Sequence, residues 1–263
     1  MPSPIVIKIG GVALEQQSAS PALWTRLVAL HRSHPGGLVL VHGGAKAVAR
    51  LLAALGMETK RHNGLRITPP DQMDIITGVL AGTLNKKLVG CINAAGGKAV
   101  GLCLGDGNDL HAARLHVQGT DLGCVGEVTG GDAGLLRTLL AHQYLPVVAC
   151  VGLDASGTPL NINGDDAAAG VAKALSAHSL VLLTDVAGVL DADKRLITQL
   201  SPADIQRLSA QGVITGGMIP KLQAAAATAA HLGAPVTIMS GAVTSDLERW
   251  AAGEAVGTRI LPA

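Results

Sequence analysis

Two lysines occupy positions where lysine is unusual. Lys8 stands inside the otherwise apolar run Ile5–Ile9, which predicts a buried strand, and lysine is seldom buried without a partner. Lys221 stands in the first turn of a helix expected over residues 216–232, where a cation opposes the helix dipole. A bound phosphate would favour both positions. The alternatives are a Lys8 that reaches solvent from the strand end and a Lys221 that is simply solvated.

Glycine-rich turns follow two of the expected strands. Gly10-Gly11 follows the first, and His42-Gly43-Gly44-Ala45 lies between a strand expected at 38–41 and a helix expected at 46–55. Glycines let the backbone approach a ligand and leave N–H groups free for an anion, and a helix N-terminus attracts anions. A tight turn without a ligand is the alternative. The patterns GxxxxGK[ST] and GxGxxG are absent, which excludes the P-loop and dinucleotide motifs.

A carboxylate precedes an alanine-rich helix expected over residues 165–175. The segment is Asn161-Ile162-Asn163-Gly164-Asp165-Asp166. Asp165 is either a capping or first-turn acid, which stabilises the start of a helix, or a residue with a chemical role. The residues alone leave both readings open.

The composition excludes several classes of protein. The 263 residues are 48% hydrophobic and 15% charged, which predicts a folded core in one large α/β domain or two closely joined lobes. With no Phe, one Tyr and two Trp, the chain has no stacking platform for single-stranded nucleic acid. The net charge of +1, without a basic run, gives no electrostatic footprint for DNA or an anionic membrane. We expect no apolar run long enough to span a bilayer.

Cysteine and histidine usage favours a reducing compartment and no protein-bound metal. The four cysteines form no CxxC pair, and the nine histidines include no HExxH motif. Small buried thiols in a reducing compartment are therefore the expected reading. The first residues, Met1-Pro2-Ser3-Pro4, lack the basic n-region of a secretion signal. We expect a cytoplasmic protein.

Short apolar runs alternate with helical patterns along the chain. Strands are expected at 5–9, 38–41, 99–104, 145–149, 179–184 and 236–239, and helices at 21–34, 46–55, 70–95, 133–142, 165–175, 201–209 and 216–232. Hairpins are expected at 60–68, around Asn63-Gly64, and within 105–128. Such alternation predicts an α/β protein whose mostly parallel sheet is covered on both faces. A boundary near 170–179 would divide it into lobes of about residues 1–175 and 176–263.

The motifs together resemble the amino acid kinase family. In chain order they are KIGG (8–11), HGG (42–44), NGLR (63–66), NINGDD (161–166), TDVAGVL (184–190) and TGGMIPK (215–221). The resemblance covers residues 4 to 261. It implies an αβα sandwich with an amino-acid-binding lobe and a nucleotide-binding lobe, and transfer of a phosphoryl group from ATP with Mg²⁺.

The resemblance also implies roles for individual residues. Lys8 and Lys221 match the family's phosphoryl-stabilising lysines, and Asp165 matches the acid that holds them. Gly10, Gly11 and Gly44 match backbone donors to phosphate and substrate oxygens. Substrate binding falls to Gly44, Ala45, Arg66 and Asn161, and nucleotide binding to Asp185, Val186, Ala187, Gly188, Val189, Leu190, Val213, Ile214 and Thr215.

Two longer segments narrow the expected substrate. Residues 63–78, which begin NGLRITPPD, and Gly101–Gly107 resemble the branch that phosphorylates the side-chain carboxylate of N-acetyl-L-glutamate in arginine biosynthesis. The acceptor is an anion at neutral pH, so no general base is needed. Kinases acting on acetylaminoadipate, aspartate or glutamate are one alternative. A non-catalytic ligand-binding module on the same fold is the other.

The chain departs from the family pattern at two positions, and the resemblance bears on assembly. Ala45 stands where the family usually has a third glycine, so its methyl could crowd the substrate. Gly164 stands where alanine is common, which could loosen the turn before Asp165. Arginine-inhibited hexameric members carry an extra helix before the first strand, whereas Met1–Pro4 is too short for one. We expect a homodimer, paired through the helix at 70–95, that arginine does not inhibit.

Overall fold

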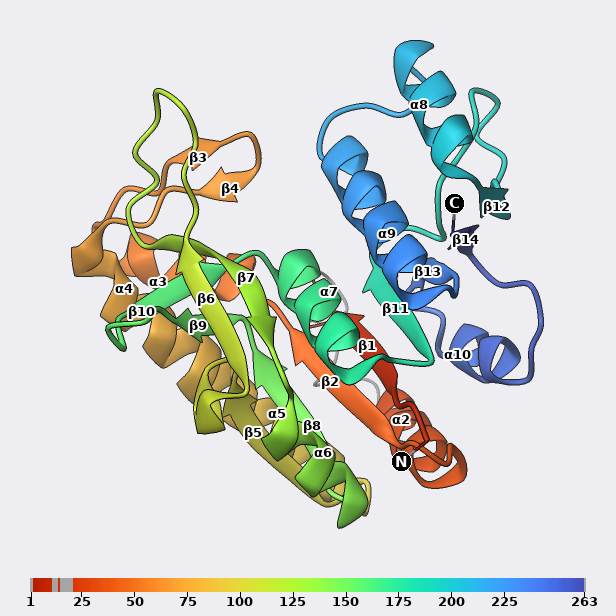
Figure 1. The fold of residues 1–263 in the computed structure, drawn as a ribbon, viewed down its shortest axis with the longest axis horizontal. Helices are drawn as coiled ribbons and strands as arrows, with labels where there is room; N and C mark the ends of the chain where they lie inside the picture. The colour runs from red at the N-terminus through yellow and green to blue at the C-terminus, as the bar shows by residue number, and fades with distance from the viewer. Residues whose placement is uncertain (1, 11–13, 15–20, 263) are drawn as a thin grey trace.

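The computed structural model describes residues 2–10, 14 and 21–262. An eight-stranded sheet lies at its centre, in the order β12-β14-β13-β11-β1-β2-β8-β5 (Figure 1). Its strands are β1 (Ile5–Ile9), β2 (Leu38–His42), β5 (Ala99–Cys103), β8 (Leu145–Ala149), β11 (Ser179–Thr184), β12 (Gln199–Leu200), β13 (Val236–Ser240) and β14 (Thr258–Ile260). Only β13 and β14 pair antiparallel, so the predicted mostly parallel sheet is confirmed.

Helices cover both faces of this sheet, as predicted. In β1, Ile5, Ile7 and Ile9 belong to one hydrophobic core, whereas Val6 belongs to the other. The first core includes side chains of α2 (Pro21–Ser33), α5 (Asn85–Ala94) and α10 (Thr244–Ala251). The second includes side chains of α3 (Ala45–Ala54), α4 (Pro70–Thr77), α6 (Gly134–Ala141), α7 (Gly164–Leu175), α8 (Pro202–Ala210) and α9 (Met218–Leu232). The period-two alternation of strand side chains therefore supplies both cores.

A smaller sheet and a short hairpin complete the fold. The sheet has the order β6-β7-β10-β9, with β6 (Leu110–Arg114), β7 (Val125–Gly131), β9 (Val151–Leu153) and β10 (Pro159–Ile162). The hairpin joins β3 (Arg61–His62) to β4 (Leu65–Arg66). Its turn residues Asn63 and Gly64 have φ of 48° and 86°, the left-handed backbone that Asn-Gly accommodates. A 3₁₀ turn, η3 (Asp106–Asn108), precedes β6.

The helix predicted at 70–95 contains a π-helical segment. η2 (Gly78–Leu84) separates α4 from α5, and wide turns of this kind shift the register of the side chains that follow. Before the shift, Met73 and Ile76 join the core that contains Val6; after it, Leu88 and Ile92 join the opposite core. The π-helical turn thus lies where the long helix passes from one core to the other.

This helix bears on the expectation that no apolar run is long enough to span a bilayer. Pro70–Ala94 has 25 residues and a mean hydropathy of 1.3 in its most apolar window, so by length and composition alone it could cross a membrane. Its buried side chains nevertheless pack into both cores of the sheet. It is therefore a core helix, although only 33% of that window is buried.

A buried histidine lies at the carboxyl end of β2. The His42 side chain is fully buried, and its Nε2 lies 3.1 Å from Nδ2 of Asn85, which is also fully buried. Asn85 Nδ2 donates a second hydrogen bond, of 2.8 Å, to the Val147 carbonyl. Burial lowers the pKa of His42 to about 4, although its bond to the Gly43 carbonyl acts in the opposite direction. The imidazole is therefore neutral near pH 7.

This burial predicts a pH-dependent loss of stability. Between pH 7 and pH 5 the unfolded chain protonates His42 whereas the folded chain does not, so stability falls as pH falls. From ordinary and folded pKa values of 6.5 and about 4, we expect the loss to be about 2 kcal/mol.

Urea unfolding of the wild type and His42→Gln at both pH values measures this loss. The variant should lack it, while other titrating groups, including His31 and His34, contribute equally to both proteins. An equal loss in the two proteins would contradict the assignment.

Candidate active site

Lys8 points from the central strand towards helix α7. It shares a face of β1 with Val6, as strand alternation predicts, and its backbone pairs with Val41 of β2 and Leu182 of β11. The side chain is 12% exposed. A lysine held this way on the middle strand needs a buried counter-charge.

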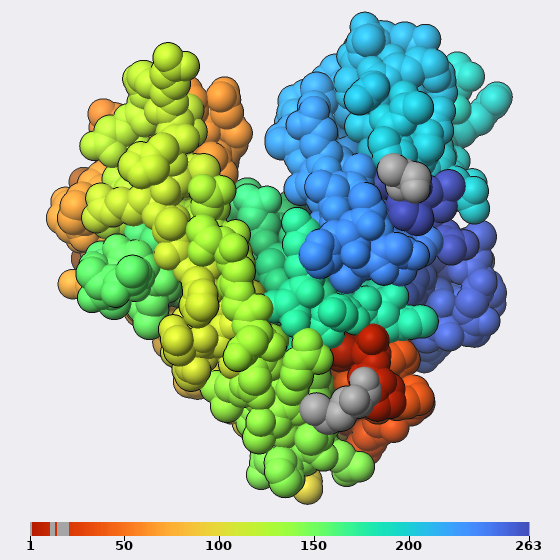
Figure 2. Space-filling model, in the orientation of Figure 1, coloured from red at the N-terminus to blue at the C-terminus, as the bar shows by residue number. Residues whose placement is uncertain are grey.

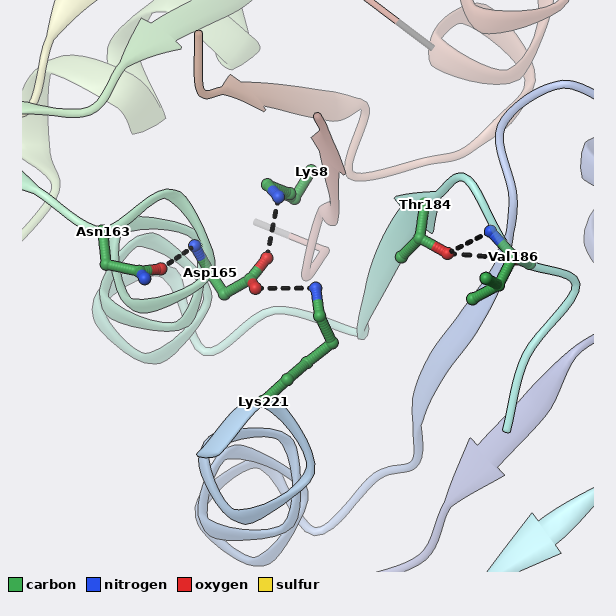
Figure 3. A network of polar contacts seen from close by, with 6 residues as sticks. All are labelled: Lys8, Asn163, Asp165, Thr184, Val186 and Lys221. Atoms are coloured by element: carbon green, nitrogen blue, oxygen red, sulfur yellow. Dashed lines mark hydrogen bonds and ion pairs between the residues drawn. The ribbon is translucent and has the colours of Figure 1, made fainter. Parts of the chain in front are cut away.

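Asp165 supplies that charge to both lysines. Its Oδ1 lies 2.8 Å from Nζ of Lys8, and its Oδ2 accepts a 2.7 Å hydrogen bond from Nζ of Lys221 (Figure 3). Asn163 caps helix α7 by accepting the Asp165 N–H at 2.8 Å. Because Asn163 makes the cap, the Asp165 carboxylate is free to bind the two ammonium groups.

The electrostatics of this triad are set by burial and by the lysines. Burial alone would raise the pKa of Asp165, but Lys8 and then Lys221 more than offset it and hold the pKa below its ordinary value. Lys221 stands in the first turn of α9, where the helix dipole disfavours a cation. The three side chains carry a net charge of +1, and they lie where an anion would be stabilised.

Glycines make room around Lys8. A Cβ on Gly10 would lie 2.5 Å from Nζ of Lys8, closer than such atoms approach. A Cβ on Gly164 would lie 3.3 Å from Cε of Lys8, which is tight but needs only a small shift. The alanine common in the family at position 164 would therefore press on the lysine. Gly11, which was predicted as a backbone donor together with Gly10 and Gly44, lies outside the described residues.

The Gly43-Gly44 turn leads into helix α3. Gly44 is its N-cap and makes no side-chain cap, and Ala45 is its first residue. A Cβ on Gly44 would lie 2.6 Å from Cδ2 of Leu80 and 2.7 Å from Cδ2 of Leu84, so any side chain here would have to displace both leucines. The first N–H groups of a helix have no intrahelical acceptor, and Gly44 and Ala45 line the same cavity as Lys8.

Arg66 is a buried cation on β4. It is 7% exposed, and it donates 2.9 Å hydrogen bonds from Nη1 to Thr59 Oγ1 and from Nη2 to the Ala45 carbonyl. Burial, and then the nearby charge of Arg61, lower its pKa. Throughout the described residues, no carboxylate forms an ion pair with Arg66. A guanidinium carries five N–H donors, so this one can still bind an anionic group.

One cavity of about 210 Å³ brings together the residues predicted for catalysis and substrate binding, except Lys221, which adjoins it through Asp165. Lys8, Gly10, Gly44, Ala45, Arg66, Asn161 and Asp165 all line it. Asn161 comes from β10 and donates a 3.0 Å hydrogen bond to Thr68 Oγ1. The surface view shows a deep hollow between the β3–β4 and β6–β7 segments on one side and α8 and α9 on the other (Figure 2).

The cavity also contains residues that the sequence analysis missed. Arg61, Cys150 and the cap Asn163 line it. Burial raises the pKa of the Cys150 thiol to about 11, so it is a neutral wall of the cavity. Asn163 lies within the quoted NINGDD motif, where its N-cap role was open to prediction. Cys150 carried no comparable signal.

The predicted nucleotide-binding segments lie apart from this cavity. Residues 185–190 follow β11, and their turn is closed by Thr184 Oγ1, which accepts from the Val186 N–H at 3.1 Å and donates to its carbonyl at 3.0 Å (Figure 3). Val186 and Leu190 are 38% and 41% exposed. In the segment 213–215, Ile214 is buried in the core beside α8. Val186 and Leu190 thus leave apolar side chains exposed, and the binding role of both segments remains a prediction.

No group of three or more metal-binding side chains occurs within the described ranges. The carboxylate of the site, Asp165, is already engaged by two lysines. The arrangement is therefore suited to stabilising a multiply charged anion between Lys8 and Lys221. A second, smaller anionic group would meet Arg66 across the same cavity.

Comparison with known proteins agrees with this geometry. Acetylglutamate kinase from Pectobacterium atrosepticum is 44% identical over 259 residues, covering 98% of this chain and 99% of that protein. The structure of smu.665 from Streptococcus mutans superposes with a TM-score of 0.84 at 31% identity, over 100% of both chains. N-acetylglutamate synthase from Neisseria gonorrhoeae superposes with a TM-score of 0.85 at 26% identity, over 99% of this chain and 60% of that one. Residues 3–240 match the amino acid kinase family, and the chain belongs to that family.

Proposed function

We propose that this protein transfers the γ-phosphoryl group of ATP to the side-chain carboxylate of N-acetyl-L-glutamate, giving N-acetylglutamyl 5-phosphate for arginine biosynthesis. One observation carries the proposal. Two lysines meet on one carboxylate beside a cavity that also holds the buried cation Arg66. Full-length identity of 44% to an acetylglutamate kinase supports the same activity.

The main obstacle to this reaction is repulsion between two anions. At about 4 Å and an effective dielectric of about 20, one pair of like charges costs about 4 kcal/mol. Lys8 approaches from the sheet and Lys221 from α9, so a phosphoryl group between them is compensated from two directions. Since the acceptor carboxylate is already ionised at neutral pH, no proton has to be removed.

Asp165 positions the two ammonium groups before substrates arrive. Without it, Lys8 and Lys221 would repel each other at close range. Its two oxygens bind the two ammonium groups at 2.8 Å and 2.7 Å, which offsets that repulsion. Each ammonium has three donors, so it can bind a phosphoryl oxygen while still bonded to Asp165.

Arg66 and Asn161 recognise the amino-acid substrate. Arg66 binds the α-carboxylate, because a guanidinium presents paired donors that match a carboxylate. Asn161 lies in the same cavity and contributes an amide to polar groups of the substrate. The Ala45 carbonyl accepts a 2.9 Å hydrogen bond from the Arg66 guanidinium. Although Ala45 stands where the family usually has a glycine, its backbone thus helps to hold the residue that binds the substrate.

ATP enters as its Mg²⁺ complex. Mg²⁺ is commonly held by substrate phosphates and few protein carboxylates, which is consistent with the engagement of Asp165 by lysines. The exposed apolar residues of 185–190 provide a surface for the adenine. On this proposal residues 1–175 form the amino-acid-binding lobe and residues 176–263 the nucleotide-binding lobe.

Two further features concern the state of the protein in the cell. All four cysteines are free thiols, which is consistent with a cytoplasmic location. In the long helix Pro70–Ala94, Ile75, Leu84 and Val89 are only partly buried. Leu51 of the adjacent α3 and its C-cap Leu55 are 41% and 55% exposed. We therefore propose a homodimer that pairs through this face.

The function and the role of the lysines are tested together by hydroxamate formation. Wild-type protein should produce hydroxamate from ATP, N-acetyl-L-glutamate and hydroxylamine. Lys8→Ala or Lys221→Ala should lower kcat by ~10²-fold or more, because each removes a charge that stabilises the transferring group. Lys60→Ala, at an exposed lysine paired with Glu58, is the matched control. Near-normal kcat in either active-site variant would refute its role.

Arg66→Lys tests substrate recognition. A lysine keeps the charge but loses the paired donors, so KM for N-acetyl-L-glutamate should rise by ~10-fold or more while KM for ATP changes little. Steady-state kinetics with each substrate varied in turn separates the two constants. Equal increases in both would indicate general distortion of the protein instead.

The dimer is tested by light scattering at micromolar concentration. We expect twice the chain mass of 26.5 kDa. Val89→Asp places a charge on the partly exposed apolar side of α5 and should shift the protein towards monomer. A monomeric wild-type protein would refute the proposed pairing.

A further inference from the structure

The peptide group between Gly43 and Gly44 is held in one orientation. Its carbonyl, that of Gly43, lies 3.0 Å from Nδ1 of His42. The preceding peptide is held by the Gly43 N–H, which donates to the Ile9 carbonyl at 3.2 Å. In a trans peptide the C=O and the following N–H point in opposite directions. His42 is fully buried and does not line the cavity, whereas Gly44 does. Binding of the Gly43 carbonyl to His42 therefore aims the Gly44 N–H into the cavity.

The Gly44 N–H is a donor without an acceptor in the described part of the chain. Gly44 is partly exposed, so a water molecule or a ligand oxygen in the cavity is the partner open to this donor. Lys8 and Asp165 line the same cavity. Gly44 therefore shares the cavity with Lys8 and Asp165, and Lys221 adjoins it through its ion pair with Asp165.

Asn85 determines which nitrogen of His42 carries the proton. Asn85 Nδ2 donates to the Val147 carbonyl, which can only accept, so its NH₂ group also faces Nε2 of His42. Nε2 must therefore accept, and the proton of the neutral ring lies on Nδ1. Nδ1–H then donates to the Gly43 carbonyl. A buried amide thus determines the orientation of an active-site peptide through the imidazole.

The position of Asn85 depends on a glycine of the neighbouring strand. Asn85 is the first residue after the π-helical turn η2. A Cβ on Gly101 of β5 would lie 1.9 Å from Oδ1 of Asn85. Gly101 has no positive φ, so its role is to leave space for the amide. Gly101 is the first residue of the segment Gly101–Gly107. This segment resembles the family in sequence, but no role was predicted for its residues.

We propose that His42 and Asn85 are positioning residues that hold the Gly44 N–H towards an oxygen of the transferring phosphoryl group. The inference rests on the proposed kinase function, because the oxygen belongs to its transition state. Neither side chain touches substrate. Both act through the Gly43–Gly44 peptide.

Two substitutions at His42 separate positioning from stability. Asn at position 42 places an amide donor near the site of Nδ1, so it can still bind the Gly43 carbonyl, but it leaves a void beside Asn85. Gln at position 42 reaches the site of Nε2 and can accept from Asn85, but it offers no donor to Gly43. We expect His42→Gln to lose ~10²-fold in kcat and His42→Asn less than ~5-fold, with KM values little changed.

Thermal unfolding should rank the two variants in the opposite order, with His42→Asn the less stable because of its void. A purely structural role for His42 would make kcat fall in step with Tm. That outcome, or full kcat in His42→Gln, would overturn the proposal.

Gly101→Ala tests the same chain of contacts from outside the active site. Its methyl displaces the Asn85 amide, so Nδ1 of His42 should lose part of its proton population, and kcat should fall by ~10-fold or more. Imidazole ¹⁵N chemical shifts measure the tautomer without any substrate. Gly90→Ala on α5 is the control, because its Cβ meets no heavy atom within 4 Å.

The readouts distinguish failure of the inference from failure of the proposed function. A wild-type protein with Nδ1–H but no kinase activity would refute the function. An active wild type whose His42 carries its proton on Nε2 would refute the inference. So would a Gly101→Ala variant whose tautomer shifts while kcat stays at the wild-type value.

Discussion

The site depends on one carboxylate that binds two ammonium groups. Burying charged groups is costly unless each is paired and hydrogen-bonded, and Asp165 provides both lysines with an oxygen at under 3 Å. The three residues come from β1, α7 and α9, which lie far apart in the sequence. Their ion pairs therefore connect the two halves of the chain at the reacting centre. The three side chains keep a net charge of +1, which the proposed binding of a phosphoryl group uses.

The parallel sheet explains why these groups meet. The carboxyl ends of β1, β2 and β11 lie at the same edge, where ligands bind in open α/β sheets. Lys8 and the Gly43-Gly44 turn reach this edge from neighbouring strands. The smaller sheet and the β3–β4 hairpin then add Asn161 and Arg66 from outside the main sheet. On the proposed function, charge compensation and amino-acid recognition thus come from different parts of the fold.

Local patterns predicted much of this arrangement, and tertiary contacts account for the rest. Lys8 stood out because a lysine in an apolar strand needs a partner. The longer strands of the main sheet and most of its helices followed from their periodicity, whereas the short strands β12 and β14 and the helix α10 were not predicted. β9 and β10 were missed because short, polar-flanked strands have little periodic signal. The π-helical turn and the His42–Asn85 bond could not be predicted, since the two residues are 43 positions apart. Gly101 was noted only through the resemblance. A glycine is needed there because a side chain would collide with the Asn85 amide, and this contact has no signal in the local sequence.

The histidine beside the active site also bears on the chemistry. A general base must have a lone pair within reach of the proton it removes. His42 is fully buried, its Nε2 lone pair is directed to the Asn85 amide, and its Nδ1 proton is directed to the Gly43 carbonyl. It therefore cannot accept a proton from a substrate. A hydroxyl acceptor would have to lose a proton during transfer, whereas a carboxylate has none to lose. Because both ring nitrogens of His42 are already hydrogen-bonded, the site suits an acceptor that has no proton to lose, such as a carboxylate. On the proposed function, the remaining requirement is charge compensation, which Lys8, Lys221 and backbone N–H groups supply.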